Sequence, residues 1–160
     1  MRSSWVVRAV VGAVLGLVLG LAGPSYAGVA GLPGGTDVDY QLGGSAPAPA
    51  HVGIVVRDRT EEPAAGRYNV CYVNGFQTQP DARRFWRQHW SLVLKQDGRP
   101  VVDAAWGEWL LDLSTPRKRA ALARIVGAWT RGCAGDGYAA VEYDNLDSFT
   151  RSKGMLERAD

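Results

Sequence analysis

The feature that most constrains the fold is a long amphipathic helix followed directly by a short apolar strand. Thr115 offers a hydroxyl cap, Pro116 suits the first helical position, and we expect the helix to end at Gly132. Residues 138–141 then have the apolar pattern of a buried strand. One stripe of the helix predicts packing against a core, and its members are Leu122, Ile125, Val126 and Trp129.

The rest of the chain extends this alternation toward the amino terminus. Residues 52–56 and 68–74 read as apolar strands, and a helix is expected over 81–90. Two short strand-like runs follow at 92–94 and 100–103. The order strand, strand, helix, strand pieces, helix, strand is typical of parallel α/β architecture, in which active groups gather where strands end.

The amino terminus has the features of a secretory signal peptide. Arg2 and Arg8 form a charged start, residues 9–22 are apolar, and small residues surround a cleavage position after Ala27. We therefore expect residues 1–27 to be removed and the mature protein to be secreted and extracellular, with no membrane contact after cleavage. An uncleaved anchor is the alternative, although the apolar run is shorter than the roughly 20 residues of a membrane span.

Composition indicates where the folded part begins and what net charge the mature chain has. Residues 28–50 are rich in glycine, proline and alanine, which favours a flexible lead-in, and residues 51–160 are expected to form the folded part. Loss of residues 1–27 leaves 16 basic and 16 acidic residues, so the mature chain is formally neutral. No nucleic-acid partner is indicated by such a balance.

The two cysteines, Cys71 and Cys133, leave two interpretations open. An exported chain permits a disulfide between them. The competing interpretation is two buried small hydrophobic residues, since free cysteine is among the most buried residue types. Neither has the spacing of a metal ligand, and we expect no structural metal site.

A polar cluster follows the last apolar strand. On a strand, Glu142 and Asp144 share one face while Tyr143 points to the other. Two neighbouring carboxylates suit acid/base or nucleophilic chemistry at a sugar or phosphate centre. The alternative is an ordinary polar turn, in which Asp144 or Asn145 caps the next element.

Four segments carry a family resemblance, in this order along the chain: 39–42, 69–74, 106–112 and 141–147. Together they resemble the secreted endo-α-1,4-polygalactosaminidases of glycoside hydrolase family 114. The resemblance implies a (β/α)₈ TIM-type barrel, hydrolysis of glycosidic bonds in galactosamine-containing polysaccharide, and no cofactor. A barrel needs about 250 residues, so we expect this α/β chain to hold only its first half and to be a truncated piece of a longer enzyme.

The family motif implies a role for each residue of the polar cluster. Asp144 matches the catalytic carboxylate, which we expect to act as the nucleophile, and Glu142, Asn145 and Asp147 would surround it. Tyr143 stands where the family usually has proline. The family's second catalytic carboxylate is a glutamate on a later strand, which nothing in this sequence matches. Residues 28–160 alone are therefore expected to be inactive.

The other matching segments imply a sugar-binding cleft. Aromatic faces stack on pyranose rings and attract ammonium groups, and acids gathered at one mouth would attract a cationic polymer. Barrel packing is the alternative for each aromatic residue. The acids expected to converge are Asp39, Glu108, Glu142, Asp144 and Asp147, and the expected binding or supporting residues are Tyr40, Gln41, Tyr72, Trp106 and Glu108.

Two other functions fit parts of the pattern. A non-catalytic carbohydrate-binding protein would use the same aromatic and acidic residues without a second carboxylate. A divalent-metal-dependent hydrolase would use Glu142, Asp144 and Asp147 as oxygen ligands.

Overall fold

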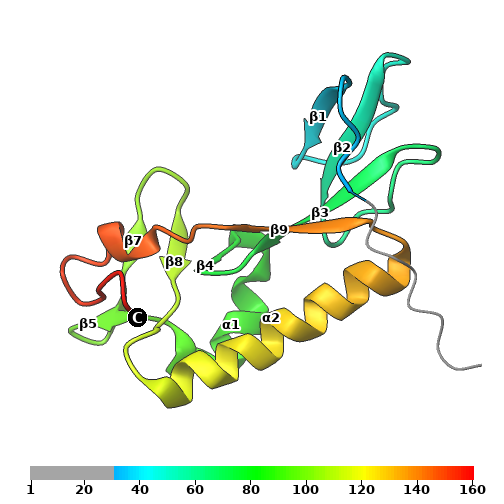
Figure 1. Ribbon diagram of the computed structural model, residues 1–160. Coiled ribbons are helices and arrows are strands. Elements are labelled where there is room, and N and C mark those ends of the chain that lie inside the picture. The colour runs from blue at the N-terminus through cyan, green and yellow to red at the C-terminus, as the bar shows by residue number, and fades with distance from the viewer. Residues whose placement is uncertain (1–30) are drawn as a thin grey trace, which may run out of the picture.

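The computed structural model describes residues 31–160, and its centre is a four-stranded parallel sheet (Figure 1). The strand order is β1-β2-β3-β9, with β1 at Asp37–Gln41, β2 at Val52–Asp58, β3 at Tyr68–Asn74 and β9 at Ala140–Asp144. Every neighbouring pair is parallel. The β-branched content of β2 and β3 explains why these two form the buried centre of the sheet. The predicted parallel α/β class is confirmed.

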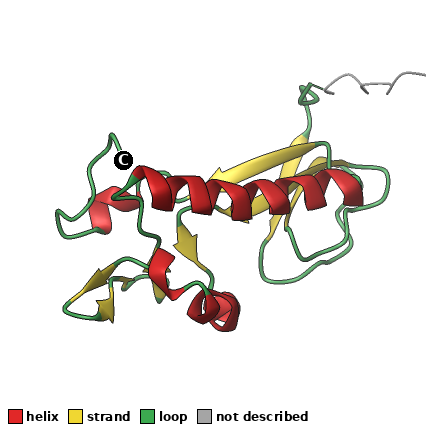
Figure 2. Ribbon diagram, turned by 90° about the horizontal axis from the view of Figure 1, so that it is seen from below, coloured by secondary structure: helices red, strands yellow, loops and turns green. Residues whose placement is uncertain are grey.

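The long helix α2 covers one face of this sheet (Figure 2). It spans Pro116–Asp136, and the Thr115 hydroxyl accepts a hydrogen bond from the amide of Lys118, as the cap predicted. The predicted end at Gly132 is wrong by one turn. The helix ends instead at Asp136 and is capped by Gly137, whose φ of 94° is the left-handed conformation that glycine adopts without steric cost.

A disulfide joins the helix to the sheet. Cys71 of β3 and Cys133 of α2 are bonded, with their Cα atoms 6.0 Å apart. Both residues are buried, and Val73 and Tyr138 complete the same cluster. The cross-link therefore lies in the buried contact between the last turn of α2 and strand β3.

The segment between β3 and α2 folds into a small subdomain at the carboxyl end of the sheet (Figure 1). It contains an antiparallel sheet of order β4-β8-β7 and a hairpin of β5 and β6. The expected helix over 81–90 divides into three short helices, and the run 92–94 is no strand, since Val93 makes only one bridge, to Leu111. The elements are β4 (Gln77–Thr78), η1 (Pro80–Ala82), α1 (Arg83–Gln88), η2 (Trp90–Leu92), β5 (Lys95–Gln96), β6 (Arg99–Pro100), β7 (Val102–Asp103) and β8 (Glu108–Leu110).

Strand β1 contradicts part of the flexible lead-in that composition predicts for residues 28–50. It lies inside residues 28–50, so the prediction of a flexible lead-in is wrong for residues 37–41. Strand pairing with β2 overrides the low packing tendency of the neighbouring glycine and proline. The predicted signal peptide lies outside the described residues. No helix in residues 31–160 has the length and apolar character needed to cross a membrane.

The sheet is strongly curved. Tyr40 on β1 and Glu142 on β9 belong to opposite edge strands, yet the phenol donates a 2.6 Å hydrogen bond to the carboxylate. Three strand spacings of a flat sheet would place these edges about 14 Å apart. The face that carries both side chains is therefore concave, and we call it the inner face. Within residues 31–160 the four strands do not close into a barrel.

Candidate active site

Asp144 is the last residue of β9 and lies at the carboxyl edge of the inner face. Tyr72 Oη donates to its Oδ2 at 2.6 Å, and the backbone amide of Asn145 donates to its Oδ1 at 2.6 Å. The register of the sheet explains the first contact, since Tyr72 and Asn74 pair with Glu142 and Asp144. Both carboxylate oxygens are thus fixed by donors from two different elements.

Tyr72 is buried beside Asp144. Burial raises the pKa of its phenol, and the hydrogen bond to Asp144 raises that pKa further, because both disfavour a second negative charge. Tyr72 therefore remains a proton donor at every ordinary pH and keeps Asp144 in place.

Glu142 lies two residues before Asp144 on the same face. Its Oε2 accepts the hydrogen bond from Tyr40, which raises the pKa of the tyrosine to about 12. Tyr143 points to the other side of the sheet, where its hydroxyl lies 2.7 Å from Thr130 Oγ1 of α2. The predicted alternation of these three residues is therefore present in the structure.

A third carboxyl group approaches the site from β8. Glu108 is 9% exposed, and its Oε2 accepts a 2.9 Å hydrogen bond from Asn74 Nδ2 at the end of β3. Burial raises the pKa of Glu108, and the charges of Asp144 and Asp103 raise it further, against the lowering effects of Asn74 and Arg151. Glu108 retains its proton to a higher pH than an exposed glutamate does.

Arg151 lies at the end of η3 (Ser148–Arg151) and connects the acidic groups. Its Nε is 2.9 Å from Asp103 Oδ2, and its Nη2 is 2.8 Å from Asp147 Oδ1. Nη2 also donates to Asn145 Oδ1 at 2.9 Å. The hydrogen bonds from Arg151 lower the pKa of Asp147. Arg151 therefore balances charge and holds the loop that follows β9.

Asn145 connects the end of β3 to Arg151 through its side-chain amide. Its φ of 65° is left-handed, a conformation that asparagine tolerates better than most residues. The side-chain nitrogen donates to Asn74 Oδ1 at 3.1 Å, while its oxygen faces Arg151. The Gln77 side chain lies beside Asn145. Its amide nitrogen donates a hydrogen bond to Glu108 Oε2 at 3.1 Å, and its amide oxygen accepts hydrogen bonds from the guanidinium of Arg151. These amide contacts fix the turn that aims the backbone N–H of Asn145 at Asp144.

This arrangement offers the groups needed for attack at a sugar carbon. Asp144 is an oriented carboxylate that can act as a nucleophile, and Glu108 is a buried carboxyl that can hold a proton. In residues 31–160, no three histidine, cysteine or acidic side chains are grouped as metal ligands. Asp147, one of the three carboxylates of the metal hypothesis, instead forms its ion pair with Arg151.

Several predicted residues lie away from this cluster. Gln41 is on the outer face of β1, where its side chain contacts Asp39 and Arg57. The expectation that Asp39 joins the acidic mouth is therefore wrong, because strand alternation turns it away from Tyr40. Trp106 is 73% exposed, so its ring is not packed against the buried groups of the site.

Sequence reasoning missed Asn74, Gln77, Asp103 and Arg151. Asn74 had a usable signal, since it ends a predicted parallel strand and the carboxyl ends of such strands share one edge. Arg151 had a weaker one, namely its spacing of four residues from Asp147. Gln77 and Asp103 reach the site through the small subdomain, whose packing no local pattern predicts.

Known proteins resemble this chain in family profile and in fold. The profile of glycoside-hydrolase family GH114 matches residues 23–160. No curated protein matches. The Aspergillus fumigatus Ega3 structure, a complex with galactosamine, aligns with a TM-score of 0.51 and 19% identity, over 76% of this chain and 52% of that one.

A second solved structure is the glycoside hydrolase domain of PelA from Pseudomonas aeruginosa. It aligns with a TM-score of 0.48 and 21% identity, over 74% of this chain and 49% of that one. The chain thus spans about half the length of the solved structures that it matches. The likeness to Ega3 supports the fold, and the family profile covers nearly all of the sequence. This chain belongs to glycoside hydrolase family 114.

Proposed function

We propose that this chain is the first half of a TIM-type barrel in a secreted enzyme that hydrolyses glycosidic bonds in galactosamine-containing polysaccharide. Asp144 is the nucleophile. The observation that carries the proposal is the double fixation of its carboxylate, by Tyr72 and by the Asn145 amide, at the carboxyl edge of a parallel sheet in a family 114 chain.

The barrel is supported by the curvature of the sheet. Closing a sheet into a barrel requires strands that wrap toward one another, and in this sheet a hydrogen bond between Tyr40 and Glu142 links side chains of the two edge strands across the concave face. Further strands adding to the free edge of β9 would extend the same curve.

The substrate class is supported by the charge of the inner edge. Galactosamine units are cationic when deacetylated, and Glu142, Asp144 and Glu108 lie along this edge. Glycoside hydrolysis needs a second carboxyl group to protonate the leaving oxygen. We assign that role to a glutamate on a later strand, because Glu108 is held at the base of the site by Asn74. Residues 28–160 alone are then inactive.

The test uses purified residues 28–160 beside the Asp144→Asn variant. We expect no release of reducing ends from a galactosamine polymer by either protein. We also expect a galactosamine oligosaccharide to bind, and Glu142→Gln to weaken that binding several-fold because a carboxylate near the ammonium group is lost. Calorimetry measures the affinity.

Three outcomes would change the proposal. Activity that vanishes in Asp144→Asn would place the second carboxyl group within residues 28–160, with Glu108 or Glu142 as the candidates. Absence of both binding and turnover would contradict the substrate class. Turnover unchanged by Asp144→Asn would remove Asp144 as the nucleophile.

A further inference from the structure

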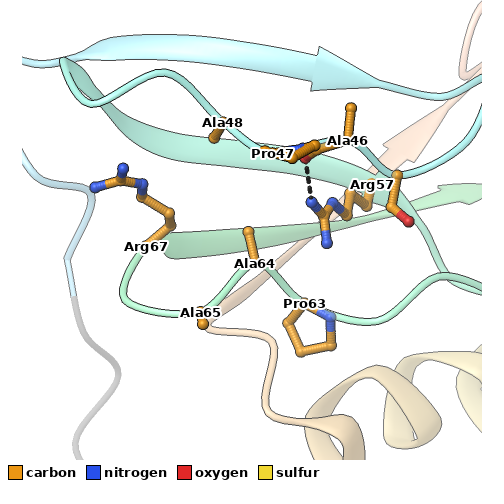
Figure 3. A pocket seen from close by; sticks show the side chains of 9 residues that line it. Ala46, Pro47, Ala48, Arg57, Pro63, Ala64, Ala65 and Arg67 are labelled. Atoms are coloured by element: carbon orange, nitrogen blue, oxygen red, sulfur yellow. Dashed lines mark hydrogen bonds between the residues drawn. The ribbon is translucent and has the colours of Figure 1, made fainter.

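A second polar region lies on the outer face of the sheet, away from Asp144. Val56 and Arg57 are consecutive in β2 and point to opposite faces, so Arg57 is outside while Val56 packs with Tyr72 inside. Arg57 lies at a cavity of about 390 Å³ between the loops 45–48 and 63–65 (Figure 3). The volume falls within the range of small-molecule sites.

Arg57 is a buried cation whose contacts are all neutral. It is 7% exposed, and its guanidinium donates to Gln41 Oε1 at 2.9 Å, to the Glu62 carbonyl at 2.6 Å and to the Ala46 carbonyl at 2.8 Å. It forms no ion pair with any residue in the described part of the chain. Burial of an unpaired charge is costly, so an anion in contact with Arg57 would be stabilised.

The guanidinium of Arg57 also has N–H donors that are not used in these three hydrogen bonds. Arginine carries five N–H groups, and the three hydrogen bonds of Arg57 leave one N–H on each terminal nitrogen. The nearest carboxylate in the hydrogen-bond network is Asp39, which reaches Arg57 only through the amide of Gln41. Asp39 is partly exposed, and the side chain of Gln41 separates its carboxylate from the guanidinium.

The rest of the cavity leaves room for a ligand. Its walls are short side chains, and Arg67 lies at the opposite end from Arg57, with one hydrogen bond of 3.3 Å to the Pro49 carbonyl (Figure 3). Arg67 likewise forms no ion pair within residues 31–160. The small wall residues are Ala46, Pro47, Ala48, Pro63, Ala64 and Ala65.

We propose that this outer-face cavity binds a small ligand through an oxyanion group, with Arg57 at its base and Arg67 at its rim. Two guanidinium groups beside small wall residues suit a carboxylated or sulfated sugar, or a phosphate. The site does not depend on the proposed function, because it shares no residue with the cluster around Asp144.

Calorimetric titrations of the full chain at constant ionic strength, in chloride, test this proposal. The probes are inorganic sulfate, inorganic phosphate and galacturonate. We expect saturable one-to-one binding of at least one probe. Tighter binding of galacturonate identifies a carboxylated sugar as the ligand class, whereas tighter binding of sulfate or phosphate identifies the corresponding ester.

Variants locate the site. Arg67→Ala should weaken binding about tenfold, the equivalent of about 1.4 kcal/mol for one charged partner. Arg57→Lys, which keeps the charge but loses the planar fork, should weaken it at least as much. Arg84→Ala removes an exposed arginine of α1 and should change nothing, and Asp144→Asn should bind normally.

The Arg67 variant keeps the test decisive if changes at Arg57 prevent folding, because Arg67 is partly exposed on the rim. Absence of saturable binding for all three probes would overturn the proposal. So would equal affinity in the Arg67→Ala and Arg84→Ala variants, since that result would mean general attraction to surface charge.

Discussion

The inner and outer faces of the parallel sheet use the same side-chain types in opposite ways. On the inner edge, Arg151 contacts the carboxylates of Asp103 and Asp147, so its charge is balanced. On the outer face, Arg57 contacts only neutral oxygens. A balanced arginine holds a site in shape, whereas an unbalanced one attracts a ligand. Carboxylates dominate the inner edge, so we expect a cationic ligand there and an anionic ligand at the outer face.

The largest expected effect concerns the outer face, where the disulfide ties α2 to β3. Replacing Cys71 and Cys133 by serine should lower the free energy of unfolding by about 4 kcal/mol, because the bond closes a long loop in the unfolded chain. Denaturant titration measures the loss. Thiol titration of the purified protein under denaturing, non-reducing conditions should find no free thiol, and two free thiols would contradict the bridge.

The next effect tests charge balance on the inner edge. Arg151→Met should lower the free energy of unfolding by about 2 kcal/mol, because the buried carboxylate of Asp103 loses its cation. The matched control is Arg84→Met, which removes an exposed arginine of similar size. If both variants lost the same stability, Arg151 would be no different from a surface arginine. Adding Asp103→Asn to Arg151→Met should recover part of the loss.

A smaller effect follows from the raised pKa of Glu108. As the pH rises above the ordinary glutamate value of 4.5, the unfolded chain releases this proton before the folded chain does. The contribution of Glu108 to stability is therefore complete below that pH and falls as the pH rises through the folded pKa. Glu108→Gln should abolish this fall and otherwise change stability by about 1 kcal/mol or less. Unfolding curves of the native protein and of Glu108→Gln, recorded between pH 4 and 8 in one buffer series, measure this difference in pH dependence.

The smallest effect is a titration on the inner face. Glu142→Gln should move the pKa of Tyr40 from about 12 back toward 10, because the hydrogen bond to a negative carboxylate is lost. In the native protein the folded pKa lies above the unfolded one, so this contribution is lost as pH rises from 10 to 12. Carbon-13 tyrosine spectra measure the midpoint, and Tyr40→Phe assigns the signal. An unchanged midpoint would show that Tyr40 and Glu142 are not hydrogen-bonded in solution.

The small subdomain shows why prediction from local pattern was uneven. Strands β2 and β3 were predicted because a continuous apolar run reports burial on both faces. Strands β4 to β8 are two or three residues long, so no periodicity can develop in them. Asp103 and Gln77 were missed for this reason, and β1 was misread because its glycine- and proline-rich surroundings outweighed its own short pattern.

The sequence alone determined the order of the main strands and helices and the placing of Glu142 and Asp144 on one face, because both depend on local spacing along the chain. The resemblance of four segments indicated the family. Only the tertiary structure decided what those carboxylates contact. Tyr40 reaches Glu142 from the far edge of the sheet through curvature, and Tyr72 reaches Asp144 through strand register. The same register and alternation sent Gln41 and Arg57 to the outer face, since one residue along a strand exchanges inside for outside.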